Sequence, residues 1–304
     1  MKIGRPPFAQ LLSASGKKGG IILCFHKIAP EKSLSWVRGL SQRYKLVSLD
    51  EMTTRRIEGR SLARLLAITF DDGWAETCKP VAEICEREKW PITIYVMSSL
   101  FDDVETFWFA EIDSLICEAR GKRIENDGMV LDLRDRAAAC SSRRDLNARL
   151  RAMPNTEALQ IINRFRALGG LPAAPGKSSA FIDPHFLRQY ANSEWVSFGS
   201  HSVDHQSLSS QSEAKLNWQL EESKNRIEEI INKPVKHFCY PYGDPEAIGK
   251  QAHSLVGRYY CSATTMIRGV CRDDCDLWYL PRIPLYDIDT DLRFLMKVAL
   301  AAWA

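Results

Sequence analysis

Two adjacent carboxylates mark the first place in this sequence where side chains could do chemistry. Asp71 and Asp72 directly follow the apolar segment 65–70 (LLAITF) and precede Gly73. Neighbouring side chains at the end of a strand point in different directions, so one carboxylate can bind a metal ion while the other acts as a base. The same two residues would also serve as the cap and first-turn acid of a helix beginning at Trp74, so the pair alone leaves both interpretations open.

Two imidazoles stand four residues apart, at His201 and His205. On a helical turn this spacing directs both rings toward one point, as in known zinc sites. Taken alone, the pair could equally be two histidines of the core. Together with Asp72, the two histidines make a three-ligand set that leaves coordination positions open for water and substrate. The combination therefore predicts a metal site.

Other polar or turn-forming residues also follow predicted strands. His26 ends the apolar segment 20–25, the turn Tyr-Pro-Tyr-Gly occupies 240–243, and Arg282 lies within the segment 280–284. In α/β folds the active site lies beyond the carboxyl ends of the strands. We therefore expect these residues to gather at one rim with the carboxylates and imidazoles.

The elements that must position these residues alternate regularly along the chain. Apolar segments typical of buried strands are 20–25, 65–70, 91–97, 194–198, 235–239, 258–263 and 280–284. Segments with helical periodicity are 74–88, 210–232, 245–256 and 289–303. A capping box at Ser210 to Glu213 opens the second of these helices, and Asp289 or Thr290 caps the last. Alternation over six or seven units predicts an α/β fold with a parallel sheet, open or closed as a barrel.

The middle of the chain interrupts this alternation. Residues 107–119, 132–153 and 156–168 have helical patterns, and the stretch 169–179 (GGLPAAPGKSS) is typical of a loop. The basic segment 134–151 is typical of a solvated helix face, with binding of an acidic glycan or an anionic lipid as the functional alternative. We expect 102–182 to form a helical insertion.

Composition excludes several classes of protein. The 304 residues are 45% hydrophobic and 26% charged, as in an ordinary globular protein that can bury a sizeable core. The net charge of +3 gives no argument for nucleic-acid binding. No apolar run approaches the roughly 18–20 residues of a membrane span, and the first 20 residues lack the apolar segment of a secretory signal.

The nine cysteines are scattered and odd in number. Without an export signal, this usage indicates reduced thiols in a cytoplasmic protein. Cys271 and Cys275 are spaced like half of a metal site, but no second pair accompanies them. A zinc site there is therefore the less favoured interpretation.

Three motifs, in this order, resemble the polysaccharide deacetylases of the NodB-homology type. They are TFDDG at 69–73, HSVDH at 201–205 and a segment ending in PYG at 241–243. The resemblance covers about residues 20–100 and 190–290, and it leaves 102–182 as an insertion within a single domain of residues 1–304. It implies a distorted (β/α) barrel of about seven parallel strands and hydrolysis of N-acetyl groups on amino sugars.

The resemblance also implies a role for each matched residue. Asp72, His201 and His205 would hold a divalent ion, zinc first, with cobalt, nickel or manganese as alternatives. Asp71 would be the general base, and the backbone N–H of Tyr242 would bind the oxyanion.

Two further residues, beside or within these motifs, are candidate substrate contacts. They are Pro241, next to the oxyanion position, and Trp74, whose ring could stack on a sugar.

Two family positions have no counterpart in this sequence. The arginine that usually precedes PYG is missing, and no histidine follows His253 to act as the general acid. Arg282 could instead pair with Asp71 and hold it ionised. His26 could donate the proton to the departing amine, as in the branch whose histidine lies in an N-terminal L-x-Y-H segment. Structural roles in the core are the alternatives for both residues.

The expected activity is removal of N-acetyl groups from a bacterial surface polysaccharide (an exopolysaccharide) or its precursor. The partner would be an N-acetylated glycan or a lipid-linked amino sugar. The amphipathic segment 292–304 either packs on the barrel or makes peripheral contact with the inner membrane. The alternatives are a catalytically silent glycan-binding protein and an amidase acting on a non-sugar amide.

Overall fold

The computed structural model describes residues 19–102, 106–173 and 180–301. Seven parallel strands form a closed barrel, because β1 pairs with both β10 and β3. The strands are β1 (Ile21–Phe25), β3 (Leu65–Phe70), β4 (Ile92–Val96), β7 (Val196–Ser200), β8 (His237–Cys239), β9 (Ser262–Arg268) and β10 (Leu280–Leu285). The predicted (β/α) barrel of about seven parallel strands is confirmed.

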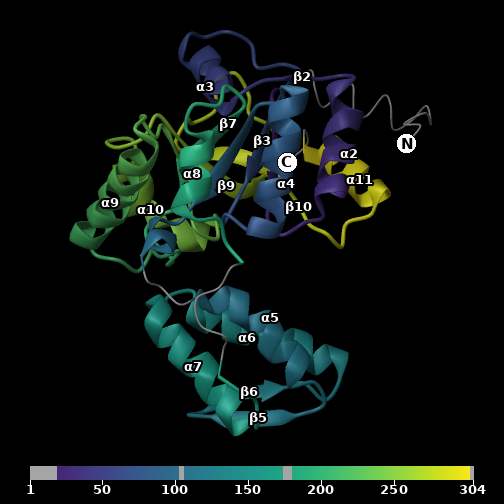
Figure 1. The fold of residues 1–304 in the computed structure, drawn as a ribbon, viewed down its shortest axis with the longest axis vertical. Helices are drawn as coiled ribbons and strands as arrows, with labels where there is room; N and C mark the ends of the chain where they lie inside the picture. Colours follow the sequence, from purple (N-terminus) through teal and green to yellow (C-terminus); the bar gives the residue numbers. More distant parts are fainter. Residues whose placement is uncertain (1–18, 103–105, 174–179, 302–304) are drawn as a thin grey trace.

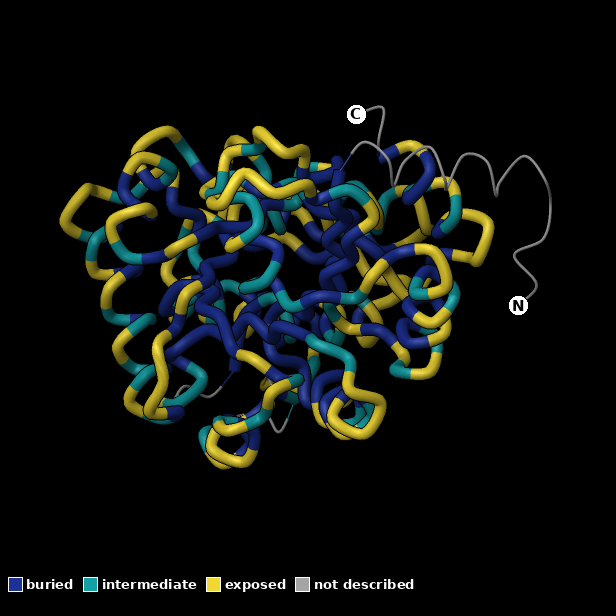
Figure 2. The backbone as a smooth tube through the Cα atoms, turned by 90° about the horizontal axis from the view of Figure 1, so that it is seen from above, coloured by how far each residue is buried: buried dark blue, intermediate teal, exposed yellow. Residues whose placement is uncertain are grey.

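Helices surround the barrel (Figure 1). They are α2 (Pro30–Ser41), α3 (Leu49–Ile57), α4 (Ala75–Glu88), α8 (Pro184–Tyr190), α9 (Glu213–Ile231), α10 (Pro245–Val256) and α11 (Asp291–Ala301). A two-residue strand, β2 (Lys45–Leu46), pairs with the start of β3, and a short 3-10 helix, η1 (Ser98–Phe101), follows β4. Buried residues fill the interior and exposed ones lie on the outer turns (Figure 2).

Several predicted boundaries differ from those of the structure, and two of these differences in the barrel have a clear local cause. The strand expected from residue 258 begins at Ser262, because the chain before it is still turning at the end of α10, where the Tyr260 N–H donates to Val256 O at 3.0 Å. Ser212, not Ser210, caps α9, because its hydroxyl accepts from Lys215 N. Neither shift moves a candidate site residue.

The segment between η1 and α8 contains α5 (Trp108–Glu118), β5 (Arg123–Asn126), β6 (Met129–Asp132), α6 (Arg136–Leu150) and α7 (Asn155–Leu168). These elements share an apolar cluster of their own, which includes Leu115, Leu131 and Ile162. The helix expected from residue 132 begins at Arg136, because an antiparallel hairpin of β5 and β6 precedes it. Asp127 and Gly128 both have positive φ, as a two-residue hairpin turn requires.

This insertion lies at one end of the barrel (Figure 1). It follows the carboxyl end of β4, and Arg151, just after α6, forms an ion pair with Asp244 at 2.9 Å. Because the strands are parallel, all their carboxyl ends face the same way, toward the insertion. Within the described ranges, no helix combines the length and apolar character needed to cross a bilayer.

Candidate active site

The carboxyl ends of the barrel strands bring the predicted site residues together. His26 directly follows β1, Asp71 and Asp72 follow β3, and His201 follows β7. Arg282 lies within β10, and its side chain is fully buried among the strands. The rim predicted from the strand order is therefore formed by residues that are up to 256 positions apart, from His26 to Arg282.

Asp72, His201 and His205 form one compact group. Asp72 Oδ1 lies 3.4 Å from the Nε2 atoms of both histidines, and one ligand atom from each residue lies within 4.8 Å of the others. The expected helical turn at 201–205 is wrong, because this segment is a loop in which Ser202 and His205 have positive φ. The Ser202 hydroxyl accepts from the His205 N–H at 3.0 Å and fixes the turn.

The surroundings of this group suit a cation. Asp72 Oδ1 is buried and has no hydrogen-bond partner in the described part of the chain. His201 Nδ1 lies 2.7 Å from Cys239 O, which leaves Nε2 free to bind a metal. Burial, together with His201, lowers the pKa of His205 to about 3, so its ring is neutral at pH 7. Two imidazole nitrogens and one carboxylate are a donor set that zinc and similar ions accept.

Asp71 forms a buried, two-pronged ion pair with Arg282. The two guanidinium Nη atoms lie 2.8 and 2.7 Å from the two carboxylate oxygens, and both side chains are at most 1% exposed. Arg282 also donates to Thr265 O and to the Thr69 hydroxyl. Burial alone would raise the pKa of Asp71, but the arginine outweighs it and holds that pKa below its usual range. Asp71 is therefore ionised at neutral pH.

Two thiols contact the same carboxylate, and the sequence analysis missed both. Cys24 Sγ and Cys239 Sγ lie 3.3 and 3.4 Å from Asp71 Oδ2. Burial raises the pKa of Cys24 well above its usual value, so its S–H stays protonated and can donate. The available signal was the alternation of β1, which places Cys24 on the same face of the strand as His26.

His26 stands at the edge of the site. Its Nε2 lies 3.7 Å from Asp71 Oδ2, and its side chain is 27% exposed, whereas that of Asp71 is 1% exposed. The ring stacks on that of Tyr286, with 6.3 Å between centroids. Of these two groups, the imidazole is the one that solvent or a ligand reaches.

The remaining predicted residues line the other side of the metal-ligand group. Tyr242 has φ of +61° and packs edge-on against His205, with 4.7 Å between centroids, while Pro241 is buried. The Trp74 indole donates to Asp72 Oδ2 at 3.1 Å and is only 8% exposed. The structure therefore gives Trp74 a contact that holds a candidate ligand, and leaves little of its ring free for a sugar.

Comparison with known proteins connects this arrangement to a family. The family model for polysaccharide deacetylase matches residues 58–260. The chain belongs to the polysaccharide deacetylase family. The match spans all three sequence motifs, and members of this family act on N-acetylated glycans and use a divalent metal. No curated protein sequence matches the chain.

Solved structures of deacetylases share the fold. The Streptococcus pyogenes deacetylase PplD, in complex with acetate, is 14% identical, with 92% of this chain and 98% of that chain covered and a TM-score of 0.58. The BpsB deacetylase domain from Bordetella bronchiseptica is 15% identical, with 89% and 97% covered and a TM-score of 0.56. IcaB from Ammonifex degensii is 15% identical, with 94% and 98% covered and a TM-score of 0.54.

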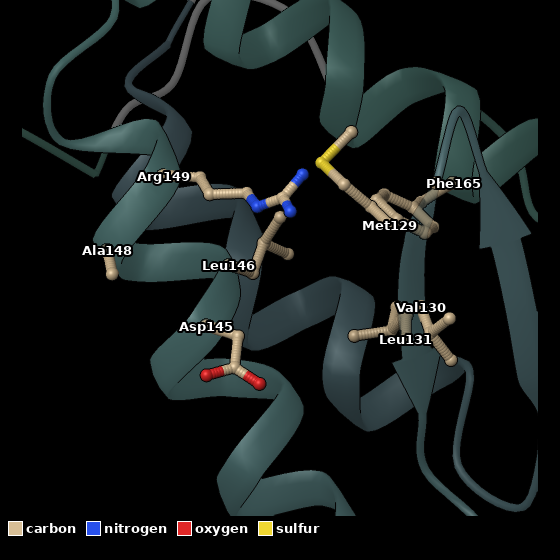
Figure 3. A pocket seen from close by; sticks show the side chains of 9 residues that line it. Met129, Val130, Leu131, Asp145, Leu146, Ala148, Arg149 and Phe165 are labelled. Atoms are coloured by element: carbon tan, nitrogen blue, oxygen red, sulfur yellow. The ribbon is translucent and has the colours of Figure 1, made fainter.

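The insertion contributes directly to the edge of the candidate site. The Phe109 ring of α5 lies 4.9 Å from that of His205, and Tyr242 packs against the insertion's apolar cluster. A separate pocket of about 480 Å³ lies between the hairpin and α6 (Figure 3). Met129, Leu146 and Arg149 line it, and its lining includes none of the candidate site residues.

The other histidines and the cysteine pair lie apart from this rim. His237 Nδ1 lies 2.9 Å from the Ser262 hydroxyl, and His253 pairs with Asp276 at 2.8 Å. In the described ranges, every group of three potential metal ligands draws on the barrel rim, and Cys271 and Cys275 belong to none. The less favoured zinc site at this pair gains no support.

Proposed function

We propose that this protein is a metal-dependent hydrolase that removes N-acetyl groups from amino sugars of a surface polysaccharide or its precursor. The observation that carries the proposal is the pairing, at one rim, of a metal-ligand group with an ionised, arginine-held carboxylate beside it. A metal-dependent hydrolase acting on an amide uses a Lewis acid and a base at the same carbonyl.

Asp72, His201 and His205 would hold the metal, with zinc the first candidate. When bound there, a divalent ion polarises the acetyl carbonyl and lowers the pKa of water. The buried Trp74 indole holds the second oxygen of Asp72 and so fixes the direction of the ligand oxygen.

Asp71 would take the proton from the attacking water. Arg282 keeps this carboxylate ionised and fixes its plane through two hydrogen bonds. Arg282 is thus a positioning residue, which substitutes for the arginine that the family usually carries before PYG.

His26 would donate the proton to the departing amine. It is the imidazole at the rim that is not part of the metal-ligand group, and it is partly exposed beside Asp71. The backbone N–H of Tyr242, held at positive φ beside buried Pro241, would bind the oxyanion. The acetate in the PplD structure has the chemical form of the product expected here.

The test is acetate release from a panel of N-acetylated substrates with zinc or cobalt added. The panel contains short oligosaccharides, a lipid-linked amino sugar and a nucleotide sugar. We expect release that disappears in Asp71→Asn and persists in the control Asp127→Asn, which alters an exposed carboxylate of the hairpin. Release that survives Asp71→Asn would refute the assignment of the base. Absence of release from the whole panel, with metal bound, would favour a binding-only protein or an amidase for a non-sugar amide.

A further inference from the structure

Exposed apolar side chains are concentrated at the C-terminal end of the barrel domain. The described residues include ten large hydrophobic side chains that are exposed, and five of them fall between positions 286 and 300. The five are Tyr286, Ile288, Leu292, Met296 and Leu300, with exposed fractions of 44–79%. The other five are single residues on separate elements, as on any protein surface.

These five residues are here called the α11 row: three of them lie on α11, opposite its packed side, and Tyr286 and Ile288 lie in the loop that precedes it. Phe294 and Val298 of α11 are fully buried, and the Phe294 ring stacks on Trp36 of α2 with 4.9 Å between centroids. Leu292, Met296 and Leu300 recur every four residues, so they lie along one side of the helix. The helix is therefore fixed to the barrel by its inner face, and the α11 row faces outward.

The α11 row begins at the edge of the candidate active site. Tyr286 directly follows β10 and stacks on His26. The loop from β10 to α11 lies at the end of the barrel that faces the insertion (Figure 1). A membrane or a protein surface that covered this row would therefore reach the opening beside His26.

The charged residues around the row argue against a second copy of this chain as the occupant. At the exposed fractions above, and roughly 180 Å² for a large apolar side chain, the α11 row presents about 500 Å². A stable interface of ~800 Å² per partner needs polar contacts around such an apolar centre, but Lys32 and Lys297 already pair with Asp287 and Asp289 of the same chain. A bilayer only has to receive the apolar side chains and imposes no matching surface.

Charge around the row is balanced. Lys32 lies 3.7 Å from Asp287, Lys297 lies 2.6 Å from Asp289, and Arg293 and Asp291 are exposed neighbours on α11. Lys297 also lies over the Tyr286 ring, 4.7 Å from its centroid. A surface of this kind has no preference for anionic lipids, so insertion of the apolar side chains must supply the affinity.

From these observations we propose that the α11 row docks on a lipid bilayer and places the opening beside His26 at the membrane surface. If the proposed deacetylase function is correct, the amino sugar is attached to a lipid and is deacetylated at that surface. Only this second part of the proposal rests on the proposed function. The docking itself requires no catalytic activity.

The test is co-sedimentation with phosphatidylcholine vesicles, with and without phosphatidylglycerol. We expect the wild-type protein to bind both kinds, with little change between about 0.1 and about 1 M sodium chloride. The double variant Leu292→Glu/Met296→Glu should lower the partition coefficient about 10-fold or more, because two inserting side chains become charged. The matched control is Ile57→Glu/Leu168→Glu, at residues 64% and 60% exposed on other elements, and it should bind as the wild type does.

Three results would overturn the proposal. They are absence of vesicle binding by the wild type, equal binding by the α11 variant, and binding only to anionic vesicles that salt abolishes. Light scattering without lipid provides a fourth, since a dimer that the α11 variant converts to monomer would assign the row to self-association.

Acetate release from a short oligosaccharide should be unchanged in this variant. Vesicle binding without any acetate release would reject the proposed function and leave the docking intact.

Discussion

The buried ion pair between Arg282 and Asp71 predicts that removing one charge costs more stability than removing both. Both side chains are almost fully inaccessible, and the guanidinium donates to both carboxylate oxygens at 2.8 and 2.7 Å. In Arg282→Met the carboxylate stays buried without its partner. In the double variant Arg282→Met/Asp71→Asn no buried charge remains.

The expected size follows from this burial. Breaking a buried pair by removing one partner typically costs about 3–5 kcal/mol, whereas replacing both charges is far less damaging. We therefore expect the double variant to be more stable than the sum of the single effects by about 2–3 kcal/mol. Because both groups are buried, solvent does not screen the interaction. For the exposed pair Arg164–Asp127, the change Arg164→Met should alter stability by no more than about 0.5 kcal/mol.

The pH dependence gives a second signature of the same pair. In the wild type the pKa of Asp71 is lowered, so the contribution of this group to stability is present above its unfolded pKa and is lost as pH falls toward the folded pKa. In Arg282→Met the strongest of the charges that oppose burial is gone, so the pKa of Asp71 rises. The variant should therefore regain stability relative to the wild type as the pH is lowered from 7 toward the unfolded value.

Urea unfolding, followed by tryptophan fluorescence and circular dichroism in the presence of a chelator, measures all four proteins of the cycle. Coincident transitions by the two probes are required before free energies are compared. Two results would refute the conclusion that Arg282 keeps Asp71 ionised. One is that the effects of the two substitutions on the free energy of unfolding are additive. The other is that the loss of stability in Arg282→Met does not change with pH.

Three other predictions concern histidines. His201→Ala should abolish tight zinc binding, because it removes one of three ligands, and unchanged metal content in the purified variant would contradict the ligand set. His26→Ala should retain the metal but lower turnover about 10²–10⁴-fold, as loss of a general acid does, and full activity would remove His26 from the mechanism. Burial lowers the pKa of His237 to about 4 from 6.5, so the folded state loses up to about 3 kcal/mol as pH falls from 6.5 to 4. His237→Gln should flatten that loss in denaturation curves, and an unchanged slope would exclude His237 as its source.

The sequence predicted the barrel and the rim because both depend on local patterns. Buried parallel strands are continuous apolar runs, and the residues after them lie at one end whatever the exact strand order. This is why Asp71, His201 and Arg282 were expected together although they are far apart in the chain. A shift of four residues at the start of β9 left this rim unchanged.

Other features depend on contacts that no local pattern encodes. The hairpin of β5 and β6 was missed although Asp127-Gly128 is a turn signal, because each of its strands has only four residues and the apolar alternation is correspondingly short. The segment between β1 and β3 received no prediction at all, although α2 and α3 form there. The contact of Phe109 with His205 joins the insertion to the barrel and could not be derived from either segment alone.

Backbone conformation at the rim explains why the motifs contain the residues they do. Eight non-glycine residues of the described chain have positive φ, and four of them lie at the candidate site: Asp72, Ser202, His205 and Tyr242. Each such conformation costs roughly 1–3 kcal/mol and persists only where the surrounding structure enforces it. Two of the three motifs contain a glycine and the third contains a serine whose side chain closes its turn. The motifs therefore supply a strained backbone that directs the ligands inward, as well as the ligands themselves.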